Sequence, residues 1–502
     1  MKRFPLHLVI AGLITGLTLP LPAAQHSKLW GERGAQWTPQ GRLPDFSFAG
    51  YHSGENPIPE LPRGTSVKEF GAVGDGAADD TQAFLDALAH VTNGVIEVPP
   101  GRYRITGLLE ITRPNVILRG AGAGRSTLFF PTPLNEIRPN WGATTGGRRT
   151  SNYSWSGGFL TLRGSFQSKT LTGIIGEANR GDSRVRVAST DSLRVGQRVE
   201  IFQTDTADNS LAIHLYSGDS GPVGNLNGRT RSSLVCRITR LEGDRVHFDR
   251  PLRCDLRQSW SPKVRAFDPT VFESGIEHLG FEFPNTRYEG HFTEVGFNAV
   301  AFRGVADCWV RNVHIRNPDS GLFIGGNFNT VRDVVIESAR EPNRNNTGHH
   351  GISVTGGDNL ITGFDFRSRF IHDLTVSHHC SGNVFSKGRG VDLALDHHRY
   401  APYENLFTDL HAGAGTRLWR CGGGADLGKH CGARGTFWNI RADRPLDYPP
   451  EGFGPLSINL VALESQRPSE TDPDGRWFEA IPPADIRPQN LHEAQLEKRL
   501  EN

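Results

Sequence analysis

The 502-residue chain is predicted to be an all-β protein, a single-stranded right-handed parallel β-helix with an inserted small antiparallel β domain. Two observations predict this fold class. A short strand pattern recurs from Phe272 onward, at intervals of about 21 to 31 residues. The chain also holds 59 glycines and 31 prolines without a collagen period, which is typical of many short strands joined by turns.

The recurring pattern is one apolar strand in each repeat. Its copies are Val310–Ile315, Val331–Ile336, Ile361–Phe366, Gly382–Phe385, Glu404–Phe407 and Gly435–Trp438. Repetition at this period indicates a solenoid, in which each coil stacks on the last and buries a shared interior. Because no helical pattern separates the strands, a β-helix is favoured over a leucine-rich or helical repeat.

Changes of character along the chain predict six segments. They are a signal peptide (1–24), an N-terminal arm (25–64), a cap with the first coils (65–134), an inserted β domain (135–265), the β-helix with its active groove (266–445) and a C-terminal tail (446–502). The basic start, short apolar run and small residues before Gln25 are typical of a signal peptide, so we expect a secreted protein. No later stretch is apolar enough to cross a bilayer.

Charge composition bears on the class of partner. Lys and Arg number 55 against 54 Asp and Glu, for a net charge of +1. No field of the whole molecule therefore favours nucleic acid or a membrane surface.

Residues 70–84 carry a specific motif, FGAVGDGxxDDTxAF. It resembles the N-terminal coil of the pectate-lyase-like superfamily, which includes glycoside hydrolases and phage tailspikes with the same opening. The resemblance covers about 65–130 and 270–445, and implies the β-helix architecture more than any one activity. We expect Asp79 and Asp80 to cap and turn the chain rather than to catalyse.

Six cysteines in an exported chain permit disulfides. We predict that Cys421 pairs with Cys431 and Cys236 with Cys254. Cys308 and Cys380 are expected to be buried thiols.

The strongest chemical signal is a tandem copy of D-L-x-[VL]-x-H-H, at Asp373–His379 and again at Asp392–His398. Matching positions on successive coils stack about 4.8 Å apart. We therefore expect His378 over His397, His379 over His398, and Ser377 over Asp396.

Cations and proton-transferring groups in one groove suit an acidic polymer, so the predicted function is a polysaccharide lyase that performs β-elimination on a uronate-containing glycan. The predicted catalytic residues are His349, His350, His378, His379, Lys387, Asp396, His397 and His398. The predicted substrate-binding residues are Arg389, Arg399, Tyr400, Tyr403, Arg417 and Arg420. No cofactor or metal is predicted, although calcium, and metal ligation by the two His pairs with Asp396, stay open.

Two alternatives remain. Gly348–Ser353 and Asn317–Gly321 resemble the G-H-G-I-S and N-T-D-G elements of the polygalacturonase family, but that family's paired aspartates and R-I-K element are absent. A glycoside hydrolase or transferase of the same fold would use carboxylates chosen from Asp319, Asp358, Asp373, Asp392 and Asp396. The other alternative is a non-catalytic, glycan-binding β-helix.

Overall fold

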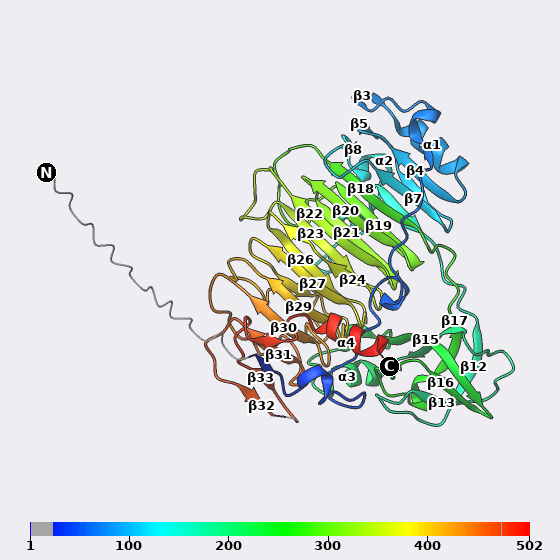
Figure 1. The fold of residues 1–502 in the computed structure, drawn as a ribbon, viewed down its shortest axis with the longest axis vertical. Helices are drawn as coiled ribbons and strands as arrows, with labels where there is room; N and C mark the ends of the chain where they lie inside the picture. Colours follow the sequence, from blue (N-terminus) through cyan, green and yellow to red (C-terminus); the bar gives the residue numbers. More distant parts are fainter. Residues whose placement is uncertain (2–23, 473, 502) are drawn as a thin grey trace.

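The computed structural model describes residues 1, 24–472 and 474–501, and its architecture is the predicted right-handed parallel β-helix (Figure 1). The coils run from the N-terminal end, near helix α1 (Thr81–His90), to the C-terminal coils beside helix α4 (Leu491–Leu500). Residues 2–23 of the predicted signal peptide lie outside the described residues. No helix in the described part of the chain is long and apolar enough to span a membrane.

One parallel sheet carries the residues on which the functional argument depends. In spatial order its strands are β28 (Leu395–His397), β26 (Phe370–Val376), β23 (Gly348–Val354), β21 (Ser320–Asn327), β19 (Asn298–Ala306), β11 (Leu160–Arg163) and β6 (Leu109–Ile111).

A second parallel stack runs along the other side of the coils. Its successive strands are β2 (Thr65–Ser66), β4 (Gly94–Val98), β7 (Val116–Gly120), β18 (Gly275–Glu282), β20 (Trp309–Arg316), β22 (Thr330–Glu337), β24 (Leu360–Thr362), β27 (Val384–Gly390), β29 (Leu406–His411), β30 (Thr436–Arg441), β31 (Asn459–Leu463) and β33 (Trp477–Glu479). The β-helix thus continues through β31 and β33, beyond residue 445, where we predicted a tail.

Shorter elements complete these coils. They are β3 (Asp75–Asp79), β5 (Gly101–Arg104), β8 (Ser126–Phe129), β25 (Asp365–Phe366), β32 (Glu470–Thr471), the pair β1 (Gln25–His26) and β34 (Ile486–Arg487), and helix α2 (Leu134–Ile137).

The repeat pattern works because equivalent apolar residues stack in register. Val310 pairs with Val331 across β20 and β22, and Val331 pairs with Ile361 across β22 and β24. Farther along, the rings of Phe385 and Phe407 stack with centroids 4.6 Å apart. Each fully buried side chain of this kind contributes roughly 1.5–3 kcal/mol, so the interior column stabilises the whole solenoid.

Helix α1 covers the first coils through its buried face of Ala83, Phe84, Ala87 and Leu88. Asp80, just before it, accepts hydrogen bonds from the Val73 and Gly74 amides at 2.5 and 3.1 Å. Asp80 therefore holds the glycine turn, as expected, but its side chain does not cap α1.

The inserted domain is a closed antiparallel barrel beside the C-terminal coils (Figure 1). Its strands are β12 (Thr170–Ile175), β13 (Arg184–Val187), β14 (Arg198–Thr204), β15 (Arg231–Glu242), β16 (Arg245–Phe248) and β17 (Lys263–Ala266), and helix α3 (Ser210–Leu215) lies between β14 and β15. The barrel begins later than the predicted residue 135, because β11 pairs with β6 and β19 of the β-helix.

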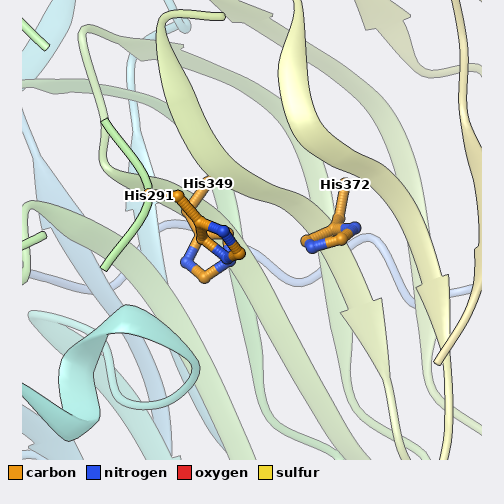
Figure 2. Close-up of side chains that lie close together, drawn as sticks. All are labelled: His291, His349 and His372. Carbon is orange, nitrogen blue, oxygen red and sulfur yellow. The ribbon is translucent and has the colours of Figure 1, made fainter. Parts of the chain in front are cut away.

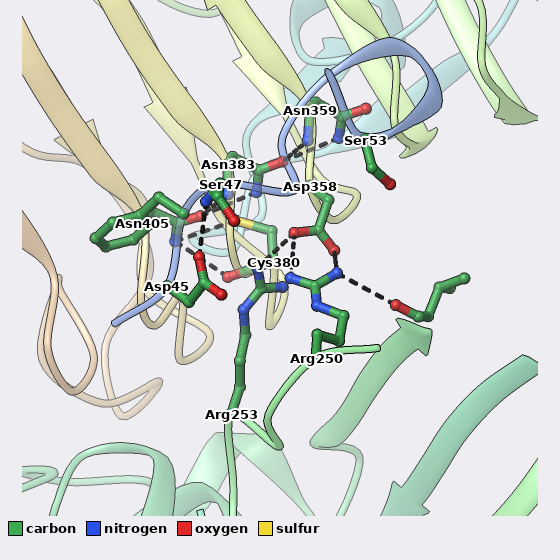
Figure 3. A network of polar contacts seen from close by, with 12 residues as sticks. Asp45, Ser47, Ser53, Arg250, Arg253, Asp358, Asn359, Cys380, Asn383 and Asn405 are labelled. Carbon is green, nitrogen blue, oxygen red and sulfur yellow. Dashed lines mark hydrogen bonds and ion pairs between the residues drawn. The ribbon is translucent and has the colours of Figure 1, made fainter. Parts of the chain in front are cut away.

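A buried ion-pair network joins the barrel to the β-helix (Figure 3). Arg250 holds both oxygens of Asp358 at 2.9 and 3.0 Å, and Arg253 also donates to this carboxylate. The three side chains are at most 5% exposed. Asp358 is thus a structural anchor for the barrel.

Next to this anchor, side-chain amides form a ladder along the β-helix. Asn329, Asn359, Asn383 and Asn405 each occupy one coil, and each donates to the next at 2.9 Å. Because every one of these amides is buried and hydrogen-bonded, the ladder fixes the register of four coils.

The two predicted disulfides are wrong. All six cysteines, which lie in the described part of the chain, are free thiols. Cys236 packs in the barrel core whereas Cys254 packs against α3, so their side chains belong to different clusters. The Cys421 sulfur accepts the His397 amide at 3.2 Å, and Cys431 donates to the Gly432 carbonyl.

Candidate active site

Four histidines and one aspartate gather along β23, β26 and β28, and a fifth histidine joins them from a loop. His350 and His372 are register partners on β23 and β26, and their rings stack 5.0 Å apart. His398, just after β28, lies 5.1 Å from the His372 ring. Asp396 is the register partner of Thr375. Adjacent coils thereby bring residues more than 20 positions apart in the chain into one cluster.

The cluster extends outward through His349 and His291. The two rings lie 4.6 Å apart edge-on, and His349 lies 5.4 Å from His372. Figure 2 shows His291 and His349 close together, with His372 beside them on the neighbouring strand. His291 comes from the loop between β18 and β19 and is exposed, whereas His349 and His372 are buried.

Asp396 is the fully buried carboxylate at the centre of the cluster. Its Oδ2 accepts from His398 Nδ1 at 2.8 Å and from the Thr375 hydroxyl at 3.2 Å, while its Oδ1 accepts the Gly422 amide at 2.7 Å. His372 Nδ1 lies 3.2 Å from the same Oδ2. Burial alone would raise the pKa of Asp396, but His372 and His398 hold it well below its ordinary value.

The contact with Asp396 makes the pKa of His398 differ from those of the other rings. Burial opposes its protonation, yet Asp396 raises the pKa of His398 above the ordinary value. Burial lowers the pKa of His291 and of His372 to about 4, and it lowers the pKa of His349 and of His350 well below the usual range. His398 therefore differs from the other four imidazoles of the cluster: its pKa lies above the ordinary value and theirs lie below it.

A second carboxylate lies behind His349. Glu294 Oε2 is 3.6 Å from His349 Nδ1, and Glu294 Oε1 accepts from the Tyr288 hydroxyl at 2.5 Å. Burial raises the pKa of Glu294 to about 7, and the nearby Asp319 carboxylate acts in the same direction. Glu294 and Asp396 thus differ in their affinity for a proton.

Two exposed arginines stand at the open side of the cluster. Arg148 donates to the His291 carbonyl oxygen at 3.4 Å, and both Arg148 and Arg420 help to lower the pKa of the His291 ring. Arg148 belongs to the hairpin of β9 (Trp141–Ala143) and β10 (Arg149–Ser151). This side of the cluster is therefore positively charged.

Aromatic rings continue outward from the same place. Phe292 stacks on His291 with centroids 3.6 Å apart, and the half-exposed Trp155 meets Phe292 edge-on at 6.2 Å. An apolar path suited to the faces of sugar rings thus leads from the histidines to the surface.

The predicted stacking of the tandem motifs is wrong by two residues. Asp396 pairs with Thr375 and His397 with Val376, instead of lying over Ser377 and His378. The reason is backbone geometry: His378 and His379 have φ values of +54° and +60°, so they turn away from β26 instead of continuing it. His378 stacks on Tyr400 at 4.5 Å, and His379 Nδ1 lies 3.1 Å from the Tyr400 carbonyl.

His397 lies in the interior. Its side chain is fully buried among the rings of Phe407, Phe437 and Phe453, at centroid distances of 5.2 to 5.5 Å. Burial lowers the pKa of His397 to about 4. This ring is a core residue and not part of the cluster.

Lys387 and Arg389 lie on β27, in the other sheet. Lys387 forms an ion pair with Glu493 of α4, and Arg389 pairs with Asp365 at 3.0 Å. The structure does not bring these two cations to the histidines.

The remaining predicted substrate-binding residues fall into two groups. Arg420 lies near His291, as described above. Arg399 donates to the Gly428 carbonyl at 2.6 Å, the buried Tyr403 hydroxyl lies 3.2 Å from Ser232 of the barrel, and the buried Arg417 pairs with Asp373. These three side chains have structural partners.

The other aspartates considered for hydrolysis are also held in place. Asp319 accepts from Arg340 at 2.8 Å and from the amides of residues 295–297. Asp373 pairs with Arg417, and Asp392 accepts from the Thr416 amide and hydroxyl. Asp396 alone of the predicted aspartates belongs to the cluster.

Sequence reasoning missed His291, Glu294, His372 and Arg148. His372 had a usable signal, since it follows His350 by 22 residues, which is one coil of this repeat. His291, Glu294 and Arg148 lie on loops or a hairpin outside the repeat, where no periodicity marks them.

Comparisons with known proteins support this architecture. Residues 64–135 match the family model described as rhamnogalacturonase A/epimerase, pectate lyase-like. Alginate lyase 7 of Azotobacter vinelandii is 32% identical over 148 residues, which are 26% of this chain and 17% of the relative. Mannuronan C5-epimerase AlgE3 of the same organism is 35% identical over 109 residues, which are 20% of this chain and 6% of the relative. The chain thus spans less than a fifth of either relative's length.

The solved structures that align with this chain are more distant in sequence. The tailspike protein gp49 of Pseudomonas phage LKA1 aligns with 79% of this chain and 67% of its own, at 14% identity and a TM-score of 0.46. An exopolygalacturonase from Thermotoga maritima aligns with 81% of both chains, at 11% identity and a TM-score of 0.36. With its stacked parallel coils and an N-terminal segment that matches a pectate-lyase-like family model over residues 64–135, the chain resembles the pectate-lyase-like superfamily of parallel β-helix proteins.

Proposed function

We propose that this protein is a carbohydrate-active enzyme, a polysaccharide lyase that cleaves a uronate-containing glycan by β-elimination. The observation that carries the proposal is the convergence of His350, His372 and His398 around Asp396, beside Arg148 and Arg420. Relatives named as alginate lyase and mannuronan epimerase favour a uronate substrate. The predicted signal peptide favours action outside the cell.

Elimination needs three groups. A base removes the C5 proton, the bond from C4 to the glycosidic oxygen breaks, and an acid protonates the leaving oxygen while a cation neutralises the carboxylate. In our proposal His398 donates the proton, because its contact with Asp396 raises its pKa. Arg148 and Arg420 bind the carboxylate at the open side of the cluster.

The proton acceptor in this proposal is His350. Its ring lies 6.1 Å from that of His398, and its lowered pKa leaves it unprotonated near neutral pH. Its Nδ1 lies 3.3 Å from the Thr375 hydroxyl, which orients the ring. His372 lies nearer to His398, but its Nδ1 is directed at Asp396.

The proposal is tested by incubating the protein with a panel of acidic and neutral glycans. Two products are followed together: the ultraviolet absorbance of an unsaturated uronate, and new reducing ends. We expect both signals to rise in parallel on an acidic polymer and neither on a neutral one. Cleavage of a neutral glycan, or reducing ends without absorbance on every acidic one, would contradict the lyase assignment.

One observation favours hydrolysis as a second candidate. Burial raises the pKa of Glu294 to about 7, so that this carboxyl is partly protonated near neutrality, whereas Asp396 is ionised. Glycoside hydrolysis requires one carboxyl group that donates a proton and a second that is ionised. Reducing ends without absorbance in the same assay would support this candidate.

A further inference from the structure

We propose that His291, His349 and His372 form a binding site for a divalent transition metal, with Zn²⁺ as the best-suited ion. One ring nitrogen from each histidine can be chosen so that all three lie within 4.8 Å of one another (Figure 2). This site goes beyond the proposed reaction, and it stands whether the enzyme is a lyase or a hydrolase.

Two of the three ligands are buried, and each has a carboxylate beside one ring nitrogen. His349 and His372 are 2% and 5% exposed, and their Nδ1 atoms lie 3.6 Å from Glu294 Oε2 and 3.2 Å from Asp396 Oδ2. A carboxylate beside one ring nitrogen orients the imidazole so that the other nitrogen can bind a metal ion. The two rings come from neighbouring strands, so the sheet itself fixes their separation.

The donor set selects the class of ion. Three imidazoles suit zinc and other late first-row metals, whereas calcium and magnesium require oxygen ligands. Zn–N bonds of about 2.0–2.1 Å in a tetrahedron place the nitrogens about 3.3 Å apart, so the ligands must close in by up to about 1.5 Å from separations of at most 4.8 Å. His291 is the exposed ligand on a loop, and its ring is the one free to make that adjustment.

A second group, made of His372, Asp396 and His398, has the same spacing but suits a metal less well. Asp396 and His398 already bond to each other at 2.8 Å, and Asp396 accepts two further hydrogen bonds. Because His372 belongs to both groups, it can serve only one ion. Asp396 is instead placed like the carboxylates that orient metal-ligating histidines from behind.

Glu294 would play the same part for His349, since its Oε2 lies 3.6 Å from Nδ1 and is itself without a hydrogen bond. Three protein ligands leave the fourth position of a tetrahedral ion open, and the exposed His291 places that position on the solvent side. An oxygen ligand such as a uronate carboxylate could bind there.

The test is metal binding by the full chain after removal of metals with a chelator. Co²⁺ is added, and its visible absorption reports tetrahedral nitrogen coordination; Zn²⁺ is then added to displace it. We expect one Co²⁺ per chain, replaced by one Zn²⁺, and a rise in the midpoint of thermal unfolding when Zn²⁺ binds. No tetrahedral band, or no saturable stoichiometry, would overturn the proposal.

Variants locate the site. His291→Ala changes an exposed loop residue, so it should fold normally yet abolish the Co²⁺ band, as should His372→Gln. Asp396→Asn should weaken binding about 10- to 100-fold by loosening His372. The matched control is His378→Gln, whose ring stacks on Tyr400 outside the cluster and which should bind normally. Binding by folded His291→Ala equal to wild type would contradict the assignment.

Discussion

The behaviour of each histidine in this molecule depends on what its ring faces. His397 and His398 are neighbours in the chain, yet one packs among phenylalanines and the other meets Asp396 at 2.8 Å. The pKa of His397 falls to about 4, while the pKa of His398 rises. A single step along the backbone therefore separates a core residue from the proposed proton donor.

Gly422 is the residue that lets the covering loop approach these rings. A Cβ atom at this position would lie 2.5 Å from His398 Cε1 and 2.8 Å from His372 Cε1. We predict that Gly422→Ala displaces one or both rings and lowers kcat on the cleaved glycan by at least about tenfold. Gly452→Ala is the matched control, because nothing lies within 4 Å of its Cβ. Equal kcat in the two variants would mean that the loop does not position the histidines.

At the scale of elements, buried ion pairs hold the barrel against the β-helix. Arg250 and Arg253 come from the barrel, and Asp358 comes from the turn between β23 and β24. The pairing restricts how the inserted domain can sit, because both guanidinium groups must reach one carboxylate. Such pairs contribute little net stability but are costly to break.

Asp358→Asn is predicted to destabilise the protein by about 3–5 kcal/mol, since two buried arginines would lose their counter-ion. Denaturant unfolding, followed by intrinsic fluorescence, measures this. Asp244→Asn makes the same chemical change in an exposed pair with Arg186 and should cost far less stability, because solvent screens that pair. Similar costs for the two variants would contradict the structural role of Asp358.

The same anchor predicts an acid sensitivity. Burial alone would raise the pKa of Asp358, but Arg250 and Arg253 lower it below the ordinary value of 3.8. A depressed folded-state pKa contributes stability that is present above the unfolded pKa and is lost as pH falls through the folded one. Wild-type stability should therefore drop below about pH 4, and Asp358→Asn should remove part of that dependence.

At the scale of the whole molecule, both ends of the described chain lie on the same coils. The Phe46 amide donates to Gln495 Oε1 and Gln495 Nε2 donates to the Pro44 carbonyl, each at 2.9 Å. Trp30, Phe46 and Leu491 share one apolar cluster with Leu406 and Trp438 of the β-helix. The arm and α4 thus cover the second sheet and leave the histidine sheet to the loops.

The β-helix could be predicted because its signal is repeated. Each coil repeats the apolar pattern seen at Val310 and Val331. Because these equivalent residues pair with each other, the pattern also predicts the register of the stack. The site could be predicted only in part, because sequence motifs mark His349, His350, Asp396 and His398 but not His291, Glu294 or His372. His291 comes from an irregular loop, and the left-handed turn at His378 cannot be distinguished by pattern from a continuing strand.

The measurement that tests the central claim most directly is the elimination rate of His398→Ala compared with His379→Ala, on the glycan that the wild type cleaves. Both variants remove one imidazole from a copy of the same sequence motif, but only His398 contacts Asp396. We predict that His398→Ala loses at least about 100-fold in kcat while His379→Ala stays within a few-fold of wild type. Near-normal turnover by a folded His398→Ala, or equal losses in both, would contradict the assignment of the chemistry to this cluster.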